Sequence, residues 1–134
     1  MSPPFLLRRT FPITPSTNFP DYPKWGVWPN AYFGSYRDFK NGATFEGGVA
    51  CALDRNAILG GTTATEQCFP AGVSYDVLLP SDLDGLTPPP DRSTNLYITL
   101  GVDTTHIDSF SFRVDFVYLA NSTFTGPTHL QVPA

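Results

Sequence analysis

Five aspartates could supply the carboxylate pair that hydrolyses a glycosidic bond. Such a pair works at separations of about 5–9.5 Å, with one group acting as the acid and the other as nucleophile or base. Most of these aspartates stand beside Gly, Pro or Thr, which are typical of turns, so solvated turns are the favoured interpretation. The candidates are Asp21, Asp82, Asp84, Asp103 and Asp108.

Asp82 and Asp84 have a spacing found in calcium-binding loops, and Gly85 follows them. Calcium takes 6–8 oxygen ligands, and an EF-hand supplies them from fixed positions of one loop. Here Leu86 stands where a third ligand is needed and Ser93 stands where the closing glutamate is needed. An ordinary Asp/Gly turn is therefore favoured. Calcium is kept as the one candidate cofactor, and no other cofactor is expected.

His106, with its neighbours Asp103, Asp108 and Ser109, has the residue types of a catalytic triad. Residues so close together on one tight turn rarely reach the required geometry, and the chain has no G-x-S-x-G motif. The favoured interpretation is a polar hairpin tip before Phe110. We assign no catalytic residue from the sequence.

Cys51 and Cys68 are the two cysteines of the chain. Neither a C-x-x-C motif nor a nearby histidine pair accompanies them, which disfavours a redox centre or a zinc site. A disulfide is favoured over two buried thiols because the Thr-rich, Tyr-rich and Lys-poor composition is typical of secreted proteins. An extracellular location is therefore expected. The N-glycosylation sequon at Asn121 is compatible with it.

Aromatic residues are concentrated between positions 22 and 36 and form a candidate ligand platform at Trp25, Trp28 and Tyr32. Tyr and Trp rings stack on sugars and are frequent at binding surfaces, but they also fill cores. In a strand, Trp25 and Val27 would face one way while Gly26 and Trp28 would face the other. A core position is the favoured interpretation, with carbohydrate as a candidate partner.

The composition indicates which elements must position these groups. The chain has 14 Pro, 11 Gly, 11 Phe, 6 Tyr and one Met, which favours short strands and turns over a helix bundle. A net charge of −4 makes a nucleic-acid partner unexpected. There is no run of 18 apolar residues, so no membrane-spanning helix is expected.

Period-two alternation predicts the strands. It is clear from Thr44 to Leu53, and again from Phe110 to Tyr118 with the aromatic rings on one face. A helical turn is expected over 54–59, with Asp54 as its cap and Gly60 as its end. The other expected strands are 25–28, 31–36, 65–69, 75–79, 95–102 and 129–132, and 81–92 is expected to be a loop.

Eight strands in two groups of four predict an all-β fold of antiparallel sheets. Each group has the size of one propeller blade, so two propeller-blade-like four-stranded units are expected, with a β-sandwich as the alternative. Residues 1–20 are expected to form a Pro-rich N-terminal tail or edge segment, and residues 21–134 the all-β domain. Two blades alone would leave sheet surfaces unpaired.

A string of motifs resembles segments of large, uncharacterised secreted bacterial proteins of presumed β-propeller architecture. The first motif is the run from Asp21 to Phe33, DYPKWGVWPNAYF. The similarity extends over about residues 21–133 and keeps the same motif order. The later motifs are Thr44–Ala52, Leu53-Asp54-Arg55, Cys68-Phe69, Leu79–Pro90, Phe110–Phe116 and Asn121–Pro127. The resemblance implies blade-like sheets in a secreted bacterial protein, and it implies no activity.

Two functions from different classes are therefore expected. The first is an extracellular structural or binding module without catalytic activity, self-assembling through exposed sheet edges. Its partner would be another copy or the remainder of a larger β-protein. The alternative is a carbohydrate-active, glycoside hydrolase-like propeller fragment that uses aspartate carboxylates.

Overall fold

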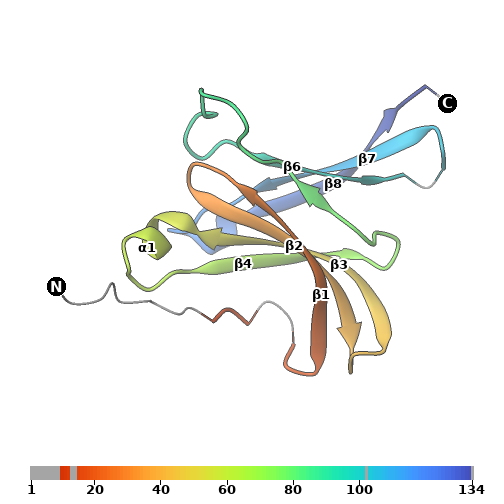
Figure 1. The fold of residues 1–134 in the computed structure, drawn as a ribbon, viewed down its shortest axis with the longest axis horizontal. Coiled ribbons are helices and arrows are strands. Elements are labelled where there is room, and N and C mark those ends of the chain that lie inside the picture. Colours follow the sequence, from red (N-terminus) through yellow and green to blue (C-terminus); the bar gives the residue numbers. More distant parts are fainter. Residues whose placement is uncertain (1–9, 13–14, 102, 134) are drawn as a thin grey trace.

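The computed structural model describes residues 10–12, 15–101 and 103–133, and within them the chain forms two four-stranded sheets (Figure 1). All neighbouring strands are antiparallel, and in each sheet they lie in chain order. This confirms the predicted all-β fold with two antiparallel four-stranded sheets. The first sheet contains β1 (Asn18–Val27), β2 (Ala31–Lys40), β3 (Thr44–Asp54) and β4 (Glu66–Gly72). The second contains β5 (Leu79–Pro80), β6 (Asn95–Leu100), β7 (His106–Arg113) and β8 (Thr123–Gln131).

The N-terminal boundary of the sheets lies a little before the expected one. β1 begins at Asn18, so the last three residues of segment 1–20 belong to an outer strand of the first sheet. Residues 1–9, 13 and 14 of that segment lie outside the described residues. No helix in the described residues is long and apolar enough to cross a bilayer.

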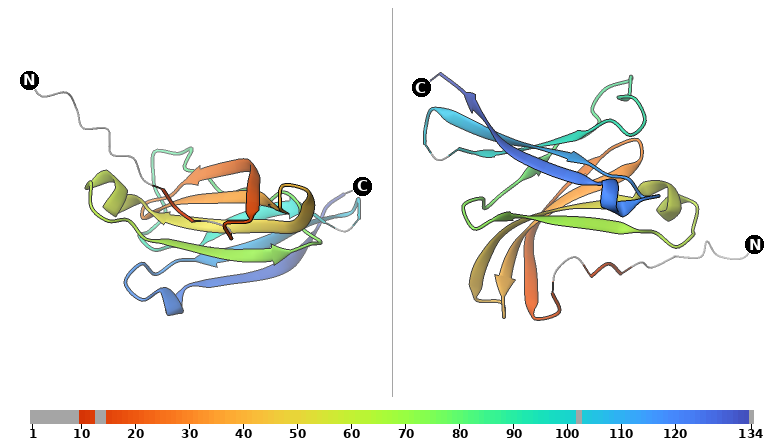
Figure 2. Two further views of the ribbon diagram at one scale, coloured as in Figure 1. Left: turned by 90° about the horizontal axis from the view of Figure 1, so that it is seen from below. Right: turned by 180° about the vertical axis from the view of Figure 1, so that it is seen from behind.

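The two sheets lie one over the other and share an aromatic core (Figure 2). Phe33 of β2 contacts Tyr97 of β6 and Phe112 of β7, with ring centroids 6.2 and 5.3 Å apart. Phe69 of β4 also contacts Phe112, at 5.3 Å. Each of these rings lies on the face of its strand that points toward the other sheet, because side chains along a strand alternate between its two faces. Face-to-face packing of the two sheets therefore buries one face of each.

Tyr97 joins the sheets by hydrogen bonding as well as by packing. Its side chain is fully buried, and its hydroxyl lies 3.0 Å from the carbonyl oxygen of Gly34 and 3.1 Å from that of Cys51. Gly34 and Cys51 are direct cross-strand partners in β2 and β3. A buried hydroxyl needs such an acceptor, so this contact fixes the height of β6 over the first sheet.

Alkaline pH is expected to destabilise the fold because buried tyrosines resist ionisation. Burial raises the pKa of Tyr97 well above 10.0, and burial aided by the charge of Glu66 raises that of Tyr36 to about 12. A folded-state pKa above the unfolded value gives stability that is complete below about pH 10 and declines as pH rises further. Urea unfolding at a series of pH values measures this decline. Tyr36→Phe should reduce it, whereas Tyr118→Phe, at an exposed position, should not. A stability independent of pH between 9 and 11.5 contradicts the prediction.

The expected helical turn is confirmed. α1 spans Arg55–Leu59, and the backbone N–H of Ala57 donates to Oδ1 of Asp54 at 3.0 Å. The backbone N–H of Gly60 donates to the Asn56 carbonyl at 2.9 Å and ends the turn. The residues chosen as cap and stop therefore act as expected.

Three strands in the second sheet differ clearly from expectation. β5 spans only Leu79–Pro80 rather than 75–79, because the chain turns before it, where the backbone N–H of Tyr75 donates to the Gly72 carbonyl. β7 ends at Arg113 rather than continuing to Tyr118, because Oδ1 of Asp115 accepts the backbone N–H groups of Val117 and Tyr118 and turns the chain. β8 begins at Thr123, not His129, and Gly126 lies inside it. There the ladder with β7 shifts register, and Gly126 has φ 147, which glycine adopts readily. The Gly-Pro pair thus marks an irregularity within a strand, not its start.

Candidate functional site

The predicted disulfide between Cys51 and Cys68 is present. The two residues are direct partners across β3 and β4, which places both side chains on the same face of the first sheet. Cys51 has no exposed surface. The bond is therefore a structural link between neighbouring strands, and no other cysteine exists in the chain.

The three aromatic residues expected as a ligand platform lie on two different faces. Trp25 and Tyr32 share the outer face of the first sheet, since their cross-strand partners are Gly34 and Val27. Trp25 is 49% exposed and lies on Gly34, where a Cβ would be 2.8 Å from its ring. Trp28 packs against the core instead, and its Nε1 donates to the Ser93 carbonyl at 3.0 Å. Only Trp25 and Tyr32 could act on one ligand.

The loop proposed for calcium has a structural role at Asp82. Its Oδ1 accepts the backbone N–H of Val27 at 2.7 Å and that of Leu83 at 2.9 Å. The bond to Val27 holds the chain that follows β5 against the edge of β1. Asp84 is exposed. Calcium at Asp82 and Asp84 stays a prediction.

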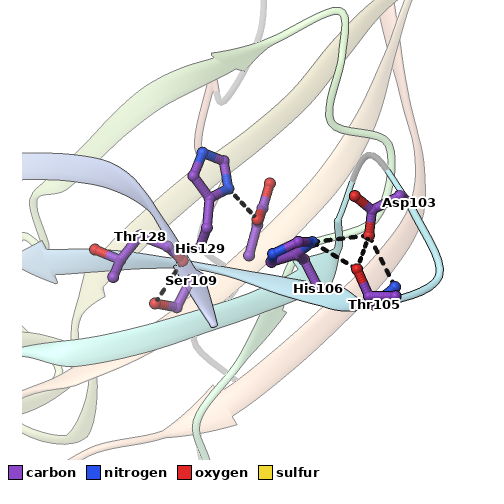
Figure 3. Close-up of polar contacts among 7 residues, drawn as sticks. Asp103, Thr105, His106, Ser109, Thr128 and His129 are labelled. Carbon is purple, nitrogen blue, oxygen red and sulfur yellow. Dashed lines mark hydrogen bonds and ion pairs between the residues drawn. The ribbon is translucent and has the colours of Figure 1, made fainter. Parts of the chain in front are cut away.

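The histidines form two separate pairs with aspartates at one end of the second sheet (Figure 3). Nδ1 of His106 lies 2.8 Å from Oδ1 of Asp103, and this hydrogen bond lowers the pKa of Asp103 to about 2. Nδ1 of His129 lies 2.6 Å from Oδ1 of Asp108, a cross-strand partner with no exposed surface. The His106–Asp103 pair connects the start of β7 to the turn before it. The His129–Asp108 pair connects β8 to β7.

Ser109 does not join these pairs. It follows Asp108 in β7, so its side chain points to the opposite face of the sheet. Its Oγ lies 3.5 Å from the Thr128 carbonyl in β8. The structure therefore does not bring Ser109 together with the two His–Asp pairs.

Two cavities on the described residues are lined by residues other than the candidate glycosidase carboxylates. The larger cavity, of about 480 Å³, lies beside α1, and a smaller one, of about 260 Å³, lies on the second sheet. Neither lining includes any of the five aspartates singled out from the sequence. The larger cavity is lined by other charged residues, which sequence reasoning did not connect because they are far apart along the chain.

Part of the outer face of the second sheet is apolar, and we call this part the aliphatic face. Strand register places its six members on one side: Leu79, Leu96, Ile98, Leu100, Ile107 and Leu130. The same side of the sheet also carries the polar residues Ser109, Ser111, Thr125 and Thr128. Leu100 is 87% exposed and Ile98 is 43% exposed. A shallow cavity of about 260 Å³ lies among the aliphatic side chains. Since the other face of this sheet packs into the aromatic core, clusters of apolar side chains lie on both of its faces, whereas an antiparallel sheet with one solvated face usually has such a cluster on one face only.

The strand edges are less open than the aliphatic face. In the described part of the chain, β4 and β8 are outer strands, but each contains a proline, Pro70 or Pro127, which cannot donate a ladder hydrogen bond. The edge of β1 is approached closely by the chain after β5, since a Cβ on Gly26 would lie 2.3 Å from the Ser81 carbonyl oxygen. The aliphatic face is therefore a stronger candidate for an interaction surface than the strand edges.

Comparison with known proteins adds no relative to this geometry. A scan against protein-family models and searches of curated proteins and of solved structures each returned no match. The surfaces described above therefore carry the functional argument.

Proposed function

We propose that the chain is an extracellular structural or binding module without catalytic activity, which assembles with further copies of itself through the aliphatic face. The observation that carries this proposal is a set of six aligned Leu and Ile side chains on one sheet, five of which are exposed: Leu79, Leu96, Ile98, Leu100 and Leu130. Contiguous apolar surface of this kind is rare on monomeric proteins and marks interaction sites. The outer strand β8 belongs to the same sheet as the aliphatic face.

The arrangement of the sheets supports a second copy as the partner. Each sheet is a four-stranded meander, the topology of a propeller blade, whereas sandwiches use crossing Greek-key connections. In a blade-like assembly the aliphatic face of one copy would lie on the outer face of the first sheet of the next. That face presents Trp25 and Val27, which are 49% and 38% exposed. Such head-to-tail contacts form a ring where the rotation closes. The remainder of a larger β-protein could present an equivalent sheet.

The disulfide supports an extracellular location. Disulfides persist in oxidising compartments and are rare in the reducing cytosol. The sequon residue Asn121 is exposed, so a glycan there would extend into solvent. The alternative of a carbohydrate-active enzyme is less well supported, because neither of the two cavities is lined by any of the five candidate aspartates.

The mass of the protein in solution tests the proposal. We expect multi-angle light scattering after size exclusion to give a mass of two or more whole chains, and we expect this assembly to dissociate on dilution. The double variant Ile98→Lys/Leu100→Lys should be monomeric, because burying two lysines in an apolar interface is costly. Leu86→Lys is the matched control, since Leu86 is fully exposed in a loop away from the aliphatic face. A wild-type monomer at millimolar concentration, or a double variant that assembles as wild type does, contradicts the proposal.

A further inference from the structure

The larger cavity is an open cleft of about 480 Å³ at one end of the molecule. Four chain segments from both sheets line it: the β1–β2 turn, the segment around α1, the loop before β6, and the turn after β7. Its volume falls within the ~300–1,000 Å³ range of small-molecule sites. The residues that matter below are Asp54, Asn56, Asp91, Arg92, Asp115 and Phe116.

The charges of the lining select against anions. The lining includes three carboxylates, those of Asp54, Asp91 and Asp115, and one guanidinium, that of Arg92. Backbone N–H donors, first that of Tyr118, lower the pKa of Asp115, so its carboxylate is ionised at neutral pH. A phosphate or an acidic sugar would be repelled by this excess of negative charge. A neutral ligand with many hydroxyl groups would instead donate to the carboxylates.

The composition of the lining also decides between a metal ion and an organic ligand. Among the described residues, no group of three or more His, Cys, Asp or Glu side chains is close enough to hold a metal ion. The cleft instead mixes carboxylate acceptors, the amide of Asn56 and the donors of Arg92 with apolar surface from Phe116. Sugars have hydroxyl edges and apolar C–H faces, which match this mixture.

We propose that this cleft binds a neutral carbohydrate, one or two sugar units in size. Asp91 and Arg92 hydrogen-bond its hydroxyl groups, and Phe116 lies against its apolar face. The site is distinct from the aliphatic face and requires neither assembly nor catalysis. It differs also from the platform expected at Trp25 and Tyr32, which lies on the outer face of the first sheet.

Backbone amide NMR with isotope-labelled full-length protein tests the proposal. The probes are glucose, galactose, mannose, N-acetylglucosamine and lactose at millimolar concentrations, with inorganic phosphate and Ca²⁺ as comparison ligands. We expect at least one sugar to shift amide resonances of residues 54–62, 91–92 and 114–117 in a saturable manner. Shifts from phosphate or Ca²⁺ alone, shifts centred elsewhere, or no sugar-dependent shifts overturn the proposal.

Variants of exposed residues separate binding from folding. Asp91→Asn and Arg92→Ala should each weaken sugar binding about tenfold, because both side chains are about 70% exposed and have no packing role. Asp84→Asn and Arg113→Ala, outside the cleft, are matched controls and should bind as wild type does. Unchanged affinity in both cleft variants overturns the proposal. The assembly variant Ile98→Lys/Leu100→Lys should keep sugar binding, so failure of the assembly proposal and failure of this one are distinguishable.

Discussion

Replacing Phe112 with alanine is expected to lower the free energy of unfolding by about 4 kcal/mol, the typical cost of removing a fully buried phenyl group. Phe112 has no exposed surface and contacts rings from both sheets. Centroid distances are 5.3 Å to Phe33 and to Phe69, and 5.7 Å to Phe124. The cavity would lie between the sheets, where neither can move in to fill it without breaking its own ladder. Equilibrium urea denaturation followed by tryptophan fluorescence measures the change.

Two further variants make this result interpretable. Phe19→Ala removes the same group from a 57% exposed position in β1 and should cost well under half as much. Phe112→Leu keeps most of the volume and should give an intermediate loss, which serves if the alanine variant does not fold. Equal losses for Phe19→Ala and Phe112→Ala would show that the two sheets do not share one core.

Strand prediction succeeded where a single local rule decided the structure and failed where a side chain overrode it. Alternating aromatic residues correctly placed Phe110 and Phe112 on the buried face of β7. The same alternation continues through Phe116 to Tyr118, but the chain turns at Asp115, and Tyr118 is 68% exposed. The turn depends on two backbone N–H groups that donate to one carboxylate oxygen of Asp115. Hydrophobic periodicity contains no information about these hydrogen bonds.

The candidate surfaces were harder to predict because they depend on what covers each face. In β6, Leu96, Ile98 and Leu100 alternate with Asn95, Tyr97 and Thr99, so hydrophobicity alone favours burial of the aliphatic side. The aromatic partners of Tyr97 come from β2, β7 and β8, and only the packing of the sheets shows that the aliphatic side is the exposed one. The cleft brings together Asn30, Asp91 and other residues from distant turns. No local spacing could have indicated it.

Removing the disulfide with Cys51→Ala/Cys68→Ala is expected to cost about 3 kcal/mol of stability in the chain-entropy model. The bond joins residues 17 positions apart, so the unfolded chain gains the freedom of that loop when the bond is absent. The folded state should change little, because β3 and β4 remain paired on both sides of the bond. Since the effect arises mainly in the unfolded chain, the dependence of unfolding free energy on urea should also become steeper.

Wild-type protein unfolded with and without reductant provides an independent measure of the same change, without any substitution in the core. The two experiments should agree to within about 1 kcal/mol. Thr63→Ala is the matched control, because it alters an exposed residue inside the same loop and leaves the loop closed. If the double alanine variant loses much more stability than the reduced wild type, the contribution comes from packing around the buried Cys51 side chain. If neither loses stability, the bond does not restrict the unfolded chain.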